Sequence, residues 1–134
     1  MVAMGVLGLM VVSLFAGISS GFDVVRVARE NLRATQILEE RMEVIRLIKW
    51  DNVTPGFIPT TFSAPFYAAD PTNSPAGGLI YSGTVLVTNS GISEGYAADL
   101  RLIQINLTWT SGNVTRNREM TTYVSKYGMQ NYIY

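Results

Sequence analysis

The hydrophobic and polar positions divide the chain into three parts. Residues 1–22 contain no charged side chain, and the first charge is Asp23. Residues 23–52 repeat apolar and charged positions with the period of a helix. Residues 53–134 contain a Pro-rich stretch and then three segments in which apolar and polar residues alternate, as in strands. The pattern therefore predicts an apolar helix segment, an amphipathic helix and a globular head.

The uncharged first part has the length of a membrane-crossing helix, which needs about 20 apolar residues. A helix that is apolar on every side must be covered by lipid or by protein. A secretory signal peptide is one alternative, but no basic segment precedes the run and no Ala-x-Ala site ends it. A plain single-pass anchor is a second alternative, and the pattern alone leaves it open.

Small residues are frequent in this first part, and in membranes they let helix backbones approach each other. They are Ala3, Gly5, Gly8, Ser13, Ala16, Gly17, Ser19, Ser20 and Gly21. Gly17 and Gly21 form a GxxxG pair, which is typical of helix association. Gly and Ser also lower helix propensity. We favour this second interpretation, in which residues 17–21 are the place where the helix can unwind.

Residues 23–50 predict a strong amphipathic helix that ends at Asp51 and Asn52, before Pro55 and Gly56. Its apolar stripe follows a spacing of 3.6 residues and comprises Val27, Ala34, Leu38, Ile45 and Ile48, widened by Ile37, Met42 and Val44.

The opposite side of this helix carries like charges four residues apart. The pairs are Arg29 with Arg33, and Glu39 with Glu43. Because like charges at this spacing repel each other, we expect some of them to have partners outside their own helix. A solvated charged face is the alternative interpretation.

The head is predicted to be a Pro-rich loop followed by antiparallel strands. Five prolines between residues 53 and 78 exclude regular helix and central strand there. Alternation then predicts strands over residues 79–88, 100–110 and 114–126, the last two joined by a hairpin at Ser111-Gly112-Asn113. A sheet of this kind needs a cover for its apolar face, and the amphipathic helix is the available cover.

The predicted fold class is therefore α+β, with a long N-terminal helix packed on a C-terminal antiparallel sheet. We expect the helix–sheet core to contain Leu38, Ile45 and Ile48 from the helix, with Ile103, Ile105 and Trp109 from the sheet.

The composition excludes common kinds of chemistry. The chain has no Cys and no His, so it can form neither a disulfide nor an ordinary catalytic triad, thiolate nucleophile or zinc site. The carboxylates outside the helix show no paired spacing, and the net charge of zero argues against a nucleic-acid partner. We expect no enzyme activity, cofactor or metal. Three sequons allow glycosylation, at Asn52, Asn106 and Asn113.

Three stretches resemble a known family. MVAMGVLGLMVVSLFAGISSGF is similar to the apolar segment that follows the prepilin-peptidase site in type IV pilins and pseudopilins, with Gly8 where pilins commonly carry glycine. ARENLRATQILEERMEVIRL and the LTWTSG…RNREMTTYVSKYG end also resemble bacterial proteins of this group. The resemblance covers nearly the whole chain.

The resemblance implies a structural subunit of a type IV pilus-like surface filament. Subunits of this kind reside in the inner membrane before pilus assembly machinery incorporates them into a homopolymer. The implied assembly residues are Met1, Ala3, Gly5, Gly8, Leu9, Ala16, Gly17, Gly21 and Phe22. A pseudopilin of a type II secretion system and a monomeric membrane-anchored adhesin are the alternatives.

The chain departs from the family pattern in three ways. The family carries glutamate at the fifth mature position, where this chain has Gly5, and we expect that glutamate just upstream of Met1. The family's common proline in the apolar segment is absent, so the Gly-Ser cluster would have to supply the break. The usual C-terminal disulfide loop is absent as well. The head would therefore be stabilised by the sheet and by contacts between subunits in the filament.

Overall fold

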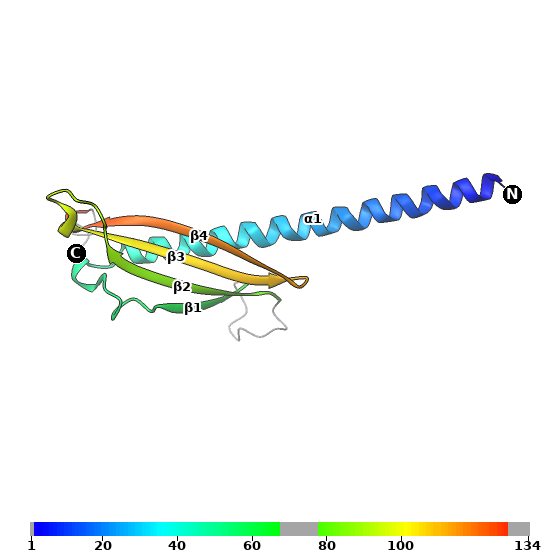
Figure 1. Cartoon of the computed structure of the whole chain (residues 1–134). Helices are drawn as coiled ribbons and strands as arrows, with labels where there is room; N and C mark the ends of the chain where they lie inside the picture. Colours follow the sequence, from blue (N-terminus) through cyan, green and yellow to red (C-terminus); the bar gives the residue numbers. More distant parts are fainter. Residues whose placement is uncertain (1, 68–77, 129–134) are drawn as a thin grey trace. The chain divides into compact units, whose positions relative to one another are not determined.

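The computed structural model describes residues 2–67 and 78–128, with side chains from Ala3 onward. It confirms the α+β fold: a long helix α1 (Val2–Arg46) precedes a four-stranded antiparallel sheet (Figure 1). The chain divides into two compact units, residues 1–33 and residues 34–134. The first unit is helix alone, and the second contains the end of α1 and the head.

The sheet has the strand order β1-β2-β3-β4, so each strand pairs with its neighbour in sequence. The strands are β1 (Thr61–Pro65), β2 (Ile80–Asn89), β3 (Leu100–Ser111) and β4 (Val114–Ser125). The last three agree with the predicted segments to within a residue at each end. Strand β1 was not predicted. It lies at the edge of the sheet, where a proline such as Pro65 is tolerated because one side of the strand makes no ladder bonds.

The β3–β4 hairpin turns at the predicted residues. Gly112 and Asn113 both have positive φ, 55° and 64°. A two-residue turn of this handedness matches the twist of the flanking strands, and Gly and Asn are the residues that adopt it at least cost. The turn fixes the register, which places Ile103 opposite Thr122 and Trp109 opposite Arg116.

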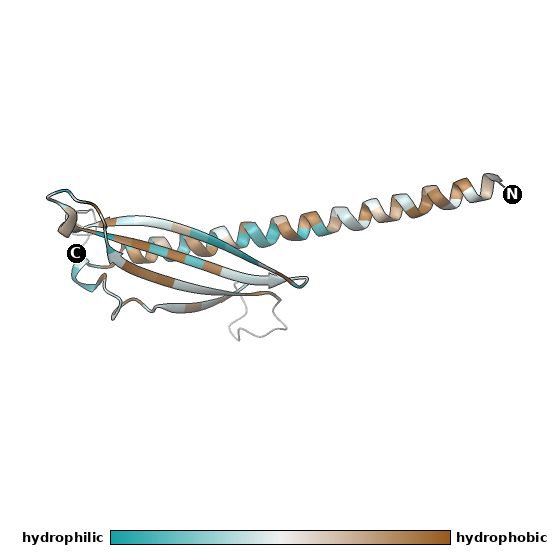
Figure 2. Ribbon diagram, viewed as in Figure 1, coloured by the Kyte–Doolittle hydropathy of each residue, from teal (hydrophilic) through white to brown (hydrophobic). Residues whose placement is uncertain are grey.

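One face of the sheet and the last turns of α1 form the core of the second unit. Alternation is visible along β3, where apolar and polar residues follow each other (Figure 2). The buried cluster contains Ala34, Ile37, Leu38, Met42, Ile45, Trp50, Val53, Ile58, Tyr81, Val85, Ile103, Ile105, Leu107, Trp109 and Val124. The predicted stripe was wrong at Val44, whose side chain is 55% exposed, because this position lies beside the buried stripe on the helix surface.

The end of α1 is also different from the prediction. The α-helix ends at Arg46 instead of at residues 51–52, and a short 3-10 helix η1 (Trp50–Asn52) follows. Arg101 on β3 explains the difference, because its Nη1 donates hydrogen bonds to the backbone oxygens of Trp50, at 2.8 Å, and Val53. Its guanidinium also lies over the Trp50 ring, 4.3 Å from the centroid. These contacts hold the segment after α1 against the sheet in a conformation other than α-helix.

The edge strand β1 is held by an aromatic contact on glycine. The Phe62 ring covers Gly83 of β2 so closely that a Cβ at position 83 would lie 2.1 Å from a Phe62 ring carbon. The guanidinium of Arg41 also lies over the Phe62 ring, 4.4 Å from its centroid. Gly83 is therefore required for the contact that joins β1 to β2 and α1.

Candidate functional site

The candidate site is the apolar segment of α1 in the first unit. Its large side chains are open to the surroundings: Leu9 is 73% exposed, Phe15 75% and Phe22 73%. Figure 2 shows the apolar residues along this end of the helix. A window of 18 residues in it has a mean hydropathy of 2.0 and no buried residue, so the helix is long and apolar enough to cross a membrane. Water is an unfavourable surrounding for such a surface.

The predicted small residues lie along the same exposed segment. A Cβ added at Gly5, Gly8, Gly17 or Gly21 would meet no atom within 4 Å, and Ala3 and Ala16 are exposed. These positions leave the helix backbone accessible to another helix. Met1, which belongs to the predicted assembly residues, lies outside the described residues.

Two serines of the segment are bonded to their own helix. The Ser13 hydroxyl donates to the Met10 carbonyl at 2.9 Å, and the Ser20 hydroxyl donates to the Ala16 carbonyl at 3.0 Å. Such bonds satisfy serine in an apolar surrounding and tend to bend the helix. The backbone is nevertheless helical throughout Gly17–Gly21 in this single chain.

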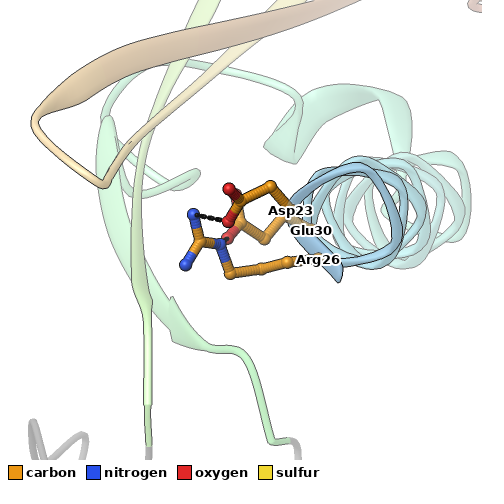
Figure 3. Close-up of polar contacts among 3 residues, drawn as sticks. All are labelled: Asp23, Arg26 and Glu30. Carbon is orange, nitrogen blue, oxygen red and sulfur yellow. Dashed lines mark ion pairs between the residues drawn. The ribbon is translucent and has the colours of Figure 1, made fainter. Parts of the chain in front are cut away.

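Charged residues follow the apolar segment immediately, and some of them neutralise each other. The Arg26 guanidinium lies between two carboxylates, 3.0 Å from Asp23 and 3.9 Å from Glu30 (Figure 3). The three residues are spaced at i, i+3 and i+7, so they share one side of the helix. Arg29, which lies between them in sequence, has no part in this group.

All six residues predicted for the helix–sheet core lie together in the second unit. Leu38, Ile45, Ile103, Ile105 and Trp109 are buried in the cluster, and Ile48 packs against it half-buried. Their burial gives the head a core of its own.

The three sequons lie in different surroundings. Asn52 in η1 and Asn113 in the hairpin turn are exposed. Asn106 lies in the middle of β3, half-buried, and its Oδ1 is buried without a hydrogen-bond partner among the described residues. Exposure at Asn52 and Asn113 is what an attached glycan would need, and the predicted glycosylation stays a prediction.

The described residues of the second unit form several depressions. One of about 480 Å³ borders Arg101, one of about 300 Å³ is lined by apolar side chains around Phe57 and Phe62, and one of about 160 Å³ contains Glu39. Within residues 2–67 and 78–128, no group of three or more His, Cys, Asp or Glu side chains is placed to hold a metal ion. The sequence pattern did not indicate the role of Arg101 or the depression at Glu39, because both depend on contacts between distant segments.

Comparison with known proteins does not assign the chain to a family. No protein-family model matches the chain, and no curated protein or solved structure matches it either.

Proposed function

We propose that this chain is a structural subunit of a type IV pilus-like filament that assembles through its apolar helix segment. The observation that carries the proposal is the exposed, uncharged segment 3–22 of α1, attached to a head with its own core. Before assembly the segment resides in the inner membrane, and pilus assembly machinery transfers the subunit into a filament at the cell surface.

The physical argument concerns the two surroundings that such a segment can occupy. Lipid covers it in the membrane, and segments of other copies cover it in a filament. The open Gly5 and Gly8 positions allow close approach of neighbouring helices, which replaces lipid contacts with protein contacts. The role is structural and needs no catalytic residue and no cofactor. The partners are therefore other copies of the chain, the membrane and the assembly machinery.

Two alternatives share part of this argument. A pseudopilin of a type II secretion system would also polymerise through the apolar segment. A monomeric membrane-anchored binding domain would use the segment only to cross the bilayer, for which its length and hydropathy also suffice. The pilus and pseudopilin hypotheses both predict that copies of the chain contact each other through the apolar segment, whereas the membrane-anchor hypothesis does not.

The test uses cells that express the full chain. Material sheared from the cell surface is collected by centrifugation and viewed by electron microscopy, for the unchanged chain and for two variants. Leu9→Arg places a charge in the apolar segment, and Leu86→Arg makes the same change at a 54% exposed position of β2. Burying an unpaired arginine between packed helices costs several kcal/mol. A cost of this size should prevent the contact between neighbouring subunits.

We expect filaments from the unchanged chain and from Leu86→Arg, and none from Leu9→Arg. An unchanged chain that stays in the membrane as a monomer would support the anchor instead. Filaments of normal length from Leu9→Arg would show that the apolar segment is not the filament core.

A further inference from the structure

Two opposite charges of α1 have no partner within the described part of the chain. Arg29 is exposed in the first unit, and its side chain makes no hydrogen bond, ion pair or ring contact with the described residues. Glu39 is exposed in the second unit and is equally without a partner among the residues described. An arginine and a glutamate left unpaired on one helix suggest a contact that a single copy does not make.

The other acids near Arg29 are already paired. Asp23 and Glu30 both contact Arg26, as Figure 3 shows for the three side chains. Arg33, one helical turn after Arg29, carries the same charge. Arg29 therefore has no free carboxylate in its own stretch of helix.

Arg29 also differs from the other cations of the chain. The sequence has 10 lysines and arginines, all within the described ranges. Eight of them contact a carboxylate, a polar group or a ring: Arg26, Arg33, Arg41, Arg46, Lys49, Arg101, Arg118 and Lys126. Arg116, the ninth, is half-buried on β4. Within the part of the chain that the structure describes, Arg29 is therefore the exposed cation whose side chain has no contact with a carboxylate, a polar group or a ring.

Glu39 lies in surroundings that fit an arginine side chain. It lines the depression of about 160 Å³ between α1 and β4, together with Met42, Met120, Thr121 and Thr122. The methionines offer apolar contact for the methylene groups of an arginine, and the carboxylate accepts hydrogen bonds from its guanidinium. Two further charges line the depression, Glu43 and Arg46, and they pair with each other at 3.0 Å.

We propose that the Glu39 depression binds Arg29 of a second copy of the chain. This inference rests on the proposed self-assembly and adds to it the residues that set the register between neighbouring copies. The two groups lie at different positions of α1, ten residues apart, which corresponds to a stagger of about 15 Å between parallel helices.

Between the parallel helices of the proposed assembly the contact is heterologous, because one surface of a copy meets a different surface of the next. A pair of copies joined in this way still presents one unused Arg29 and one unused Glu39. A third copy can therefore bind by the same contact, and repetition gives an open chain instead of a closed dimer. This geometry is what a filament subunit requires.

Charge exchange tests the pairing. Arg29→Glu and Glu39→Arg each place two like charges at the contact, and each is expected to lower the amount of sheared filament about tenfold. The variant that carries both changes restores opposite charges and is expected to recover most of the filament. Glu94→Arg, a matched reversal at an exposed carboxylate of the head without a partner in the described residues, is expected to have no effect.

Cross-linking gives a second readout that does not depend on filament yield. The chain has no cysteine, so Arg29→Cys with Glu39→Cys introduces the sole thiols. A bifunctional maleimide is suitable because an arginine–carboxylate pair separates the backbones by more than a disulfide spans. Sheared filaments should give a ladder of multimers, whereas Arg29→Cys with Glu94→Cys should give monomer.

The outcomes separate this inference from the proposed function. Normal filaments from both single charge reversals, or a doubly changed chain no better than either, would overturn the Arg29–Glu39 contact while leaving the filament intact. An unchanged chain that forms no filament would overturn the proposed function and this inference with it.

Discussion

Helix α1 contains two stretches that both carry large apolar side chains but have opposite surroundings. In residues 34–46, Ala34, Ile37, Leu38, Met42 and Ile45 are buried against the head. In residues 3–22, leucine, valine and phenylalanine side chains are exposed on every side of the helix. The first stretch is amphipathic and is buried by the second unit, whereas the second is apolar all round and is not buried by any of the described residues. This difference supports the proposal that the cover of the second stretch comes from other copies or from lipid.

The comparison separates two kinds of substitution. A change in residues 34–46 should alter the stability of the head, because its apolar contacts are made within one copy. A change in residues 3–22 should leave the head intact and alter only the state of association. The following predictions go from the largest expected effect to the smallest.

The largest effect is expected from Ile45→Asp, which puts a carboxylate into the buried cluster. Ile45 is 4% exposed, and the change combines loss of apolar burial with an unpaired buried charge, at a cost of about 3–5 kcal/mol. Val44→Asp is the matched control at the neighbouring exposed position. Urea unfolding of the full chain in mild detergent, followed by tryptophan fluorescence, measures both. Equal losses of unfolding free energy would show that the assigned helix face is wrong.

An intermediate effect is expected from Arg101→Lys. Lysine keeps the charge but cannot donate to two backbone oxygens while stacking flat on Trp50, so about 1–3 kcal/mol of unfolding free energy should be lost. Arg46→Lys is the control, because the exposed Arg46–Glu43 pair contributes well under about 1 kcal/mol. The same urea experiment compares them. A loss no larger for Arg101→Lys than for Arg46→Lys would contradict the role given to Arg101 in ending the helix.

The smallest effect is expected at the weak part of the apolar segment. Replacing both Gly17 and Gly21 by Ala should stabilise the helix in micelles by at most about 1 kcal/mol per residue. In the assembled filament we expect the unchanged chain to be non-helical somewhere between Gly8 and Gly21, although it is helical there in the single copy. Hydrogen exchange of these amides in micelles and in filaments measures the difference. Unbroken helical hydrogen bonds through Gly17–Gly21 in the filament would exclude the unwinding.

Most of the fold could be predicted because it depends on local patterns. Alternation located β2, β3 and β4 and their buried faces, since residues such as Ile103 and Ile105 follow each other at a spacing of two. Strand β1 has no such pattern. It pairs with β2, and the Phe62 ring covers Gly83, a contact between segments that sequence spacing does not reveal.

The same limit explains the end of α1. Ile48 continues the helical spacing of the apolar stripe, so the pattern predicts helix beyond Arg46. Arg101, far away in sequence, binds the backbone oxygens of Trp50 and Val53 and holds a different conformation. In the charged part of α1, the like-charge spacings of Arg29 with Arg33 and of Glu39 with Glu43 predicted partners outside the helix. The structure was needed to distinguish Glu43, which pairs with Arg46, from Glu39.

The central claim is that other copies of the chain cover residues 3–22. Its most direct test is thiol labelling of sheared, membrane-free filaments that carry a single cysteine, at Leu9→Cys or at Leu86→Cys. A water-soluble maleimide should label position 86 fully, and should label position 9 only after the filaments are dissolved. Equal labelling of the two positions in intact filaments would contradict the claim.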